Sequence, residues 1–257
     1  MKDARFVFIT GASSGIGAAL AAHYAARGAQ LGLVARRREA LADIARGLPG
    51  EPALYVADVA DARAMRDAAQ DFIARFGLPD IVIANAGVSV GTLTEHAEDI
   101  EVFGRVMQTN VVGLAATFHP FVAPMREARR GRLAGIASVA GMRGIPGAGA
   151  YSASKAAAIT YLEALRVELR SSGVKVVTVC PGYVATPMTA VNKYRMPFIL
   201  PADVAARRIA RVIDEGRRYA VVPWQMALVA RAMKLLPNAV YDRLFKRAGR
   251  KPRGLKL

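Results

Sequence analysis

The stretch Thr10-Gly11-Ala12-Ser13-Ser14-Gly15-Ile16-Gly17 lies between a β-rich run, Arg5 to Thr10, and an alanine-rich run, Ala18 to Arg27, that predicts a helix. A strand, a glycine turn and a helix in this order are typical of a nucleotide-binding βαβ unit. Glycines let the backbone approach a pyrophosphate, and the helix N-terminus supplies amide donors. The spacing is GxxxGxG rather than GxGxxG. Taken alone, the turn is also compatible with a purely structural connection.

The next predicted strand, Gln30 to Ala35, is followed by three arginines, Arg36, Arg37 and Arg38. In an NAD site an acidic residue near the end of this strand holds the ribose 2′-hydroxyl, whereas an arginine accommodates the 2′-phosphate of NADP. The arginines therefore favour NADP(H). The alternative is that they only open the helix predicted over Arg37 to Arg46, on its solvated face.

Strands and helices alternate through the rest of the chain. Further strands are predicted at Ala53 to Ala57, Asp80 to Ala84, Arg132 to Ala137 and Lys175 to Val179. Helices are predicted at Ala62 to Phe76, capped by Asp61, and from about Ile100 to Thr117, with Pro120 and Pro124 disturbing or dividing its continuation. This alternation indicates an α/β fold, a doubly wound parallel sheet with helices on both faces. Ligands of such sheets bind at the carboxyl ends of the strands.

A candidate proton donor lies in the stretch Tyr151-Ser152-Ala153-Ser154-Lys155, which opens an apolar run, Ala156 to Leu169, that predicts a helix. Residues four apart lie on one helix face, so the phenol and the ammonium project together. A nearby lysine charge lowers the pKa of a tyrosine, which is about 10 when unperturbed. Such a phenol can exchange a proton with a substrate oxygen. On its own, the pattern also fits a chance pair on a helix surface.

The composition indicates a single globular α/β domain in a reducing compartment. The chain has 257 residues, 53% of them apolar, which suffices for a full core. Its one cysteine, Cys180, cannot form an internal disulfide, which fits the cytosol. The sequence shows no secretory signal and no run of eighteen apolar residues, so no membrane span is expected. The three histidines lack ligand spacing, so no metal site is predicted.

Taken together, six motifs in this order and spacing resemble the classical short-chain dehydrogenase/reductases, over roughly residues 5 to 222. They are Thr10-Gly11-x-x-x-Gly15-x-Gly17, Asn85-Ala86-Gly87, Asn110, Ser138, Tyr151-x-x-x-Lys155 and Pro181-Gly182 with Thr186. One departure is Ala84, where the family more often has a second asparagine. The resemblance implies a Rossmann-like fold and hydride transfer between a nicotinamide and a carbonyl or alcohol carbon.

The resemblance also implies a role for each catalytic candidate. Ser138 would hydrogen-bond the substrate oxygen, and Tyr151 would be the general acid in reduction and the base in oxidation. Lys155 would hold the nicotinamide ribose and lower the pKa of Tyr151. Asn110 would keep a water in a proton relay to Lys155, through a kink in its helix.

Cofactor and substrate contacts follow from the same resemblance. The implied NADP(H) site consists of Gly11, Ser13, Ser14, Gly15, Ile16, Gly17, Arg36, Arg37, Asp58, Val59, Asn85, Ala86, Gly87, Tyr151, Lys155, Pro181, Gly182, Val184 and Thr186. Candidate substrate contacts are Ser138, Arg143, Tyr183 and Met188. The apolar loop from Tyr183 to Pro201 is either a mobile lid over a hydrophobic substrate or packed core. The expected substrate is apolar or lipid-like, of the 3-ketoacyl, keto-sphingoid or steroid type.

Residues 1–222 are expected to form the catalytic domain, and residues 223–257 an amphipathic, basic helical extension of it. An apolar helix is predicted over Trp224 to Leu236; Pro237 ends it, and Asn238 caps a second helix, Ala239 to Lys246. The basic residues at this end are Arg243, Lys246, Arg247, Arg250, Lys251, Arg253 and Lys256. Such a segment is typical of an interfacial helix at an anionic membrane. The alternative is a helix packed on the body or on a partner subunit of a homodimer or homotetramer.

Two other classes of function are less consistent with the sequence. The net charge of +16 suggests nucleic-acid binding as one possible function. However, the charged residues are scattered or lie in the tail, and no aromatic residues alternate with them. A non-catalytic NADP-binding or scaffold protein on the same fold remains the alternative to an enzyme. The expected location is the cytoplasm, with peripheral contact at the inner membrane face if the tail binds lipid.

Overall fold

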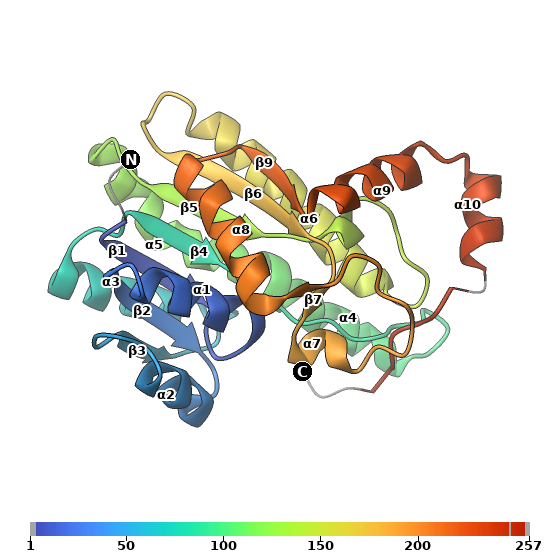
Figure 1. Ribbon diagram of the computed structural model, residues 1–257, viewed down its shortest axis with the longest axis horizontal. Coiled ribbons are helices and arrows are strands. Elements are labelled where there is room, and N and C mark those ends of the chain that lie inside the picture. The colour runs from blue at the N-terminus through green and yellow to red at the C-terminus, as the bar shows by residue number, and fades with distance from the viewer. Residues whose placement is uncertain (1–3, 247, 255–257) are drawn as a thin grey trace.

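The computed structural model describes residues 4–246 and 248–254 and contains a seven-stranded sheet in the order β3-β2-β1-β4-β5-β6-β9 (Figure 1). Its strands are β1 (Phe6–Thr10), β2 (Gln30–Ala35), β3 (Ala53–Val56), β4 (Ile81–Ala84), β5 (Arg132–Ile136), β6 (Lys175–Pro181) and β9 (Tyr219–Val222). All neighbouring pairs are parallel, so the strands' carboxyl ends lie at one edge. The order reverses between β1 and β4, where ligands of such sheets bind.

Helices connect the strands, and the doubly wound α/β fold predicted from the sequence is confirmed. They are α1 (Gly15–Ala25), α2 (Arg38–Arg46), α3 (Ala62–Phe76), α4 (Glu98–Met107), α5 (Gly113–Glu127), α6 (Gly149–Glu168), α7 (Pro187–Ala190), α8 (Ala202–Glu215), α9 (Trp224–Leu235) and α10 (Asn238–Phe245). Asp61 caps α3 as predicted, because its carboxylate accepts hydrogen bonds from the Arg63 and Ala64 backbone N–H groups.

Alternating side chains divide the core into two layers. Val7 and Ile9 of β1 join a cluster with α1 and α8, whereas Phe8 joins a cluster with α3, α5 and α6 on the other face. In Figure 1, α1 and α8 lie in front of the sheet and α5 and α6 behind it. α8 is not among the predicted helices, although its buried Ala205, Ile209 and Ile213 recur at helical spacing. The sheet is therefore covered on both faces.

α4 and α5 correct the single helix predicted from about Ile100 to Thr117. A π-helical stretch, Gln108–Val112, separates them, and α5 then runs on with Pro120 and Pro124 inside it. An interior proline costs a helix about 3 kcal/mol. The fully buried side chains of α5 include Phe118, Phe121 and Met125. Because burying each contributes about 1.5–3 kcal/mol, packing against the sheet offsets the prolines and the helix continues.

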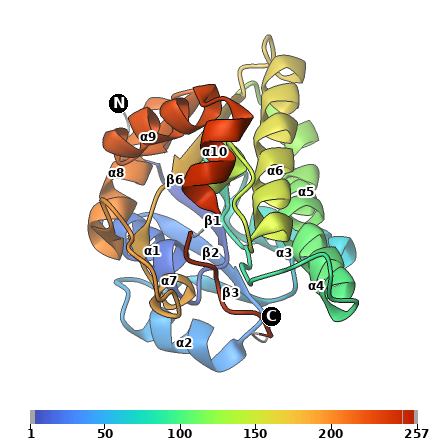
Figure 2. The same ribbon diagram turned by 90° about the vertical axis from the view of Figure 1, so that its right-hand side faces the viewer.

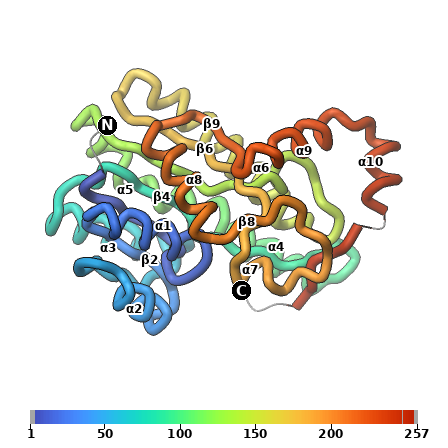
Figure 3. The backbone as a smooth tube through the Cα atoms, viewed as in Figure 1, coloured from blue at the N-terminus to red at the C-terminus, as the bar shows by residue number. Residues whose placement is uncertain are grey.

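The segment after β6 and the C-terminal segment lie beyond the same edge of the sheet, as the tube in Figure 3 shows. Two short parallel strands, β7 (Val184–Ala185) and β8 (Leu200–Pro201), bracket α7. α9 and α10 match the two predicted C-terminal helices. Asn238 does not cap α10, because Pro237 occupies the cap position and the Asn238 Oδ1 accepts a hydrogen bond from Arg143 at 2.9 Å. No helix within residues 4–246 and 248–254 is long and apolar enough to cross a membrane.

Candidate active site

A cleft of about 610 Å³ opens at the carboxyl edge of the sheet. Of the predicted cofactor residues it is lined by Gly11, Ser13, Ser14, Gly15, Ile16, Arg36, Arg37, Asp58, Val59, Asn85, Ala86, Gly87, Tyr151, Lys155, Pro181, Gly182, Val184 and Thr186. Ser138 and Met188 also line it. Residues spread over the whole sequence are thus brought to one place, because each follows the carboxyl end of a strand or opens the next helix.

The glycine turn is held against the end of β4. Asn85 Nδ2 donates hydrogen bonds to the carbonyl oxygens of Thr10 and Gly11, at 3.0 and 3.2 Å. Thr10 Oγ1 accepts hydrogen bonds from the Asn85 and Ala86 backbone N–H groups. Gly17 lies beneath this contact: a Cβ atom there would overlap Gly11 O and stand 2.5 Å from Asn85 Nδ2. Gly17 is needed for close packing rather than as part of the cleft wall.

Two arginines border the cleft beside β2. Arg37 donates a hydrogen bond to Ser13 Oγ at 3.3 Å, which joins the glycine turn to the end of β2. Arg36 lies 3.7 Å from a carboxylate oxygen of Asp58. Both pairs are exposed, so they are loose contacts that an incoming anion can replace. The two guanidinium groups therefore make this end of the cleft suitable for a phosphate.

Asn110 lies at the centre of the π-helical stretch, a local widening that often marks functional sites. Its side chain clamps the segment after β4, because Oδ1 accepts from the Val88 N–H at 2.8 Å and Nδ2 donates to the Val88 carbonyl at 2.9 Å. Nδ2 also donates to Ser154 Oγ on α6 at 2.9 Å. Asn110 thus joins β4, the π-helical stretch and the first turns of α6, but does not line the cleft.

Ser138, Tyr151 and Lys155 meet at the base of the cleft. Burial raises the pKa of Tyr151, and a hydrogen bond with Ser138 lowers it by a smaller amount. The buried Lys155 donates to the Ile136 carbonyl at 2.8 Å, and its Nζ lies 5.9 Å from the centroid of the Tyr151 ring. Burial lowers the pKa of Lys155 to about 8. Lys155 Nζ therefore lies near the Tyr151 ring while it is held on the Ile136 carbonyl, and its effect on the pKa of Tyr151 stays a prediction.

The chain matches the family of short chain dehydrogenases over residues 5–196. It belongs to the short-chain dehydrogenase/reductase family. An uncharacterized oxidoreductase of Myxococcus xanthus is 40% identical over 95% of this chain and 97% of its own. The 11-beta-hydroxysteroid dehydrogenase-like protein 3 of Arabidopsis thaliana is 36% identical over 92% and 79%. A short-chain dehydrogenase structure from Streptomyces avermitilis has a TM-score of 0.78 at 25% identity and covers 95% of this chain and 96% of that one.

As a short-chain dehydrogenase/reductase, the protein is an oxidoreductase of CH–OH groups that uses NAD(P)(H). The cleft fits such a cofactor, because the glycines of its turn have no side chains that would keep a pyrophosphate away from the backbone N–H groups. Gly11 and Gly15 have φ angles of 67° and 55°, which side-chain-bearing residues rarely adopt. A Cβ atom on Gly15 would stand 3.1 Å from Thr186 Cγ2 and narrow the space between the turn and the opposite wall. The residues present are therefore those that a pyrophosphate needs.

Two of the predicted substrate contacts do not line the cleft of this short-chain dehydrogenase/reductase. Arg143 donates hydrogen bonds to the carbonyl oxygens of Met233 and Leu236, and its guanidinium lies 3.9 Å from the centroid of the Tyr241 ring. It therefore holds α9 and α10, because carbonyls at a helix C-terminus attract a cation. Tyr183 stands outside the lining with its ring 6.4 Å from that of Tyr194.

Sequence reasoning missed Thr189, which lines the cleft beside Thr186. The two threonines form a capping box on α7, in which the Thr186 N–H donates to Thr189 Oγ1 at 3.1 Å. The signal is present in the sequence, because Thr186-Pro187-Met188-Thr189 places a proline at the first helical position after a capping threonine. The cap fixes Met188 and Thr189 over the cleft.

Proposed function

We propose that the protein is an NADP(H)-dependent oxidoreductase that interconverts a carbonyl and a secondary alcohol, with Tyr151 as the general acid of reduction and the base of oxidation. The observation that carries this proposal is that Ser138, Tyr151 and Lys155 share one cleft with the glycine turn and with Arg36 and Arg37. A scaffold protein would not need a buried lysine beside a partly buried phenol in the wall of a nucleotide-sized cleft.

Each residue has a distinct task in this chemistry. Ser138 Oγ hydrogen-bonds the substrate oxygen, and Tyr151 gives that oxygen a proton in reduction. The Lys155 ammonium holds the nicotinamide ribose and stabilises the phenolate that the proton leaves behind. Asn110, on the π-helical stretch, supports a water through which Lys155 regains contact with solvent protons. Bound NADP(H) supplies or accepts the hydride.

NADPH consumption with a panel of keto-lipids, small ketones and sugars tests this function. We expect turnover with apolar ketones, because the loop over the cleft exposes Met188, Phe198 and Ile199. The relatives from Arabidopsis thaliana named hydroxysteroid dehydrogenase-like also favour an apolar substrate, of the steroid, 3-ketoacyl or keto-sphingoid type. Tight NADPH binding without turnover of any member would instead support the non-catalytic alternative.

Cofactor preference is expected to depend on Arg36. A hydrogen bond to a charged group contributes about 1.5–3 kcal/mol, so Arg36→Ala should raise the KM for NADPH by about tenfold or more and leave the KM for NADH nearly unchanged. Arg38→Ala is the matched control, because Arg38 is exposed at the start of α2 and does not line the cleft. A wild-type enzyme that prefers NADH would contradict the assignment.

The rate of carbonyl reduction is expected to fall as pH rises through about 8. Below this pH the buried Lys155 is protonated, and above it the charge that holds the ribose and stabilises the phenolate is lost, since burial lowers the pKa of Lys155 to about 8. The measurement is kcat/KM from pH 6 to 10. The guanidinium of Lys155→Arg stays charged throughout this range. Whatever activity this variant keeps should therefore show no fall in kcat/KM near pH 8. The same fall in both proteins would assign it to another group.

We further propose that α9 and α10 contact an anionic membrane surface. Their exposed apolar side chains are Trp224, Leu228, Leu235, Val240 and Leu244, of which Leu235 is 83% exposed. Exposed cations flank this face, including Arg231, Lys234, Arg243 and Lys246. Fewer basic residues of the tail are free to contact lipid than the sequence predicts, because Lys251 and Arg253 bond to the protein body. Arg247 and Lys256 lie outside the described residues.

Sedimentation with anionic vesicles tests the membrane proposal. The wild type should sediment with vesicles at low salt, less so as salt screens the cations, and Leu235→Glu/Leu244→Glu should stay in the supernatant. Val167→Glu is the control, because Val167 on α6 is 59% exposed, close to the 62% of Leu244. A wild type that remains in the supernatant, and whose self-association resists salt, would assign this face to a homodimer or homotetramer contact instead.

A further inference from the structure

The chain after α10 turns back over the protein instead of leaving it. Residues 249–253, here called the C-terminal strap, contact three loops that follow the carboxyl ends of β4, β5 and β6. Figure 2 looks onto this end of the molecule and shows the strap descending between α7 and α4. These loops carry the cleft residues Val88, Ser138 and Met188, so the strap lies against the loops that surround the site.

The loop after β4 is shaped to receive the strap. The Gly91 N–H donates a hydrogen bond to the Pro252 carbonyl at 2.9 Å. A Cβ atom on Gly91 would overlap Lys251 O and stand 2.8 Å from Pro252 O, so only glycine permits this approach. Gly91 is three residues from Val88, which lines the cleft. The strap therefore docks at a defined place beside the site.

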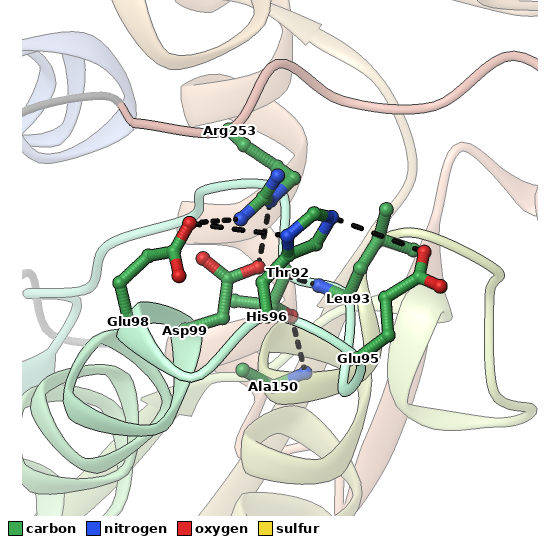
Figure 4. A network of polar contacts seen from close by, with 8 residues as sticks. All are labelled: Thr92, Leu93, Glu95, His96, Glu98, Asp99, Ala150 and Arg253. Atoms are coloured by element: carbon green, nitrogen blue, oxygen red, sulfur yellow. Dashed lines mark hydrogen bonds and ion pairs between the residues drawn. The ribbon is translucent and has the colours of Figure 1, made fainter.

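An ion pair fixes the end of the strap (Figure 4). Arg253 Nε donates to Asp99 Oδ2 at 2.8 Å, and a second guanidinium nitrogen donates to Glu98 Oε1 at 2.9 Å. The Asp99 side chain is only 5% exposed and also accepts from the Leu93 N–H at 2.7 Å. The Arg253 hydrogen bond, followed by that of Leu93, holds the pKa of Asp99 below its ordinary value. Because this carboxylate is shielded from water, its pairing with Arg253 holds the strap more firmly than a surface pair would.

The other side of the strap holds the loop over the cleft. Lys251 is 8% exposed, and its Nζ donates to the carbonyl of Met188, a cleft residue, at 2.9 Å. Gly249 lies against Tyr194, where a Cβ atom would meet Tyr194 Cγ at 3.0 Å. Burial, and then the neighbouring Tyr183 and Tyr151 phenols, raise the pKa of Tyr194 to about 12. The strap therefore holds the Met188–Tyr194 segment, which carries the cleft residues Met188 and Thr189.

We propose that the C-terminal strap is the outer wall of the substrate site and limits the size of the carbonyl compound that reaches Tyr151. The proposal rests on the proposed carbonyl chemistry for its substrate, but the wall itself consists of this chain's own contacts. Arg253 and Gly91 fix the strap on one side, and Lys251 and Gly249 hold the Met188–Tyr194 segment on the other. Loosening the strap should admit larger ketones without altering the cofactor end of the cleft.

The test compares Arg253→Ala with the wild type on a series of ketones of increasing size. One methylene in an apolar pocket changes kcat/KM by about tenfold or more, so the ratio of kcat/KM for the largest ketone to that for the smallest should rise by about tenfold. The Kd for NADPH should not change. Arg105→Ala is the matched control, because Arg105 is an exposed arginine on α4, the helix that carries Asp99 and Glu98. Gly91→Ala, which displaces the strap from its other anchor, should reproduce the effect.

Hydrogen exchange supplies a readout that does not need turnover. In Arg253→Ala, amides of the strap and of the 188–194 segment should exchange faster, and in the wild type a bulky ketone added with NADP⁺ should slow exchange in the strap. An unchanged size ratio together with unchanged exchange would overturn the wall. If the wild type reduces ketones but Arg253→Ala shows the same size ratio, the wall proposal fails and the proposed oxidoreductase function stands. Protection of the strap by ketone in an inactive wild type would overturn the function and keep the wall.

Discussion

Tyr151→Phe is expected to lower turnover by about 10²- to 10⁴-fold, the contribution of a positioned general acid, while NADPH binds as in the wild type. The substitution removes one hydroxyl and keeps the ring. Tyr151 is partly buried at the base of the cleft, so the phenylalanine ring occupies the same space. The loss should therefore appear in kcat, and the Kd for NADPH measured by fluorescence titration should stay the same.

Tyr161→Phe is the matched control for this experiment. Tyr161 lies on the same helix, α6, and packs against the core beneath the sheet rather than in the cleft. Its loss of a hydroxyl should leave kcat unchanged. Turnover close to that of the wild type in Tyr151→Phe would remove the phenol from the mechanism. A fall of similar size in both variants would point to damage of α6 instead.

Gly17→Ala is expected to lower the free energy of unfolding by about 1–3 kcal/mol, as overpacking does, and to weaken NADPH binding severely. The added Cβ would overlap Gly11 O and stand 2.5 Å from Asn85 Nδ2. The turn must then move away from β4, and the backbone that faces the pyrophosphate moves with it. Thermal unfolding and NADPH titration on the same sample measure both effects.

Gly104→Ala gives the opposite expectation with the same chemical change. Gly104 lies inside α4 and an added Cβ would have nothing within 4 Å. Because alanine is favoured over glycine in a helix interior by about 1 kcal/mol, this variant should be more stable and should bind NADPH normally. Equal effects of the two substitutions would mean that the contact between the glycine turn and β4 does not hold the cleft together.

The sequence predicts the fold and the cleft well because their signals are local. The glycine turn, the arginines after β2 and the Tyr151–Lys155 spacing each follow from short-range geometry, and the sheet brings them together. The course of α5 is not predictable in this way, because burial against the sheet offsets the local preference of Pro120 and Pro124.

Long-range contacts explain the remaining differences. Arg143 resembles a substrate contact in the sequence, but the carbonyls that bind it belong to a helix end about ninety residues later. In the sequence Lys251 and Arg253 look like part of a cationic tail. Only the structure shows that they bond to Met188, Glu98 and Asp99. The pKa of Tyr151 likewise depends on burial that no spacing of Tyr and Lys reveals.

Transfer of deuterium from NADPH that carries deuterium at both C4 positions of its dihydronicotinamide to an apolar ketone tests the central claim most directly. Mass spectrometry of the product from the wild type should show one deuterium on the carbinol carbon, since the hydride comes from the cofactor and the hydroxyl proton from Tyr151. Tyr151→Phe should form almost none of this product. Alcohol without deuterium at that carbon, or no alcohol with any ketone from the wild type despite bound NADPH, would contradict the account.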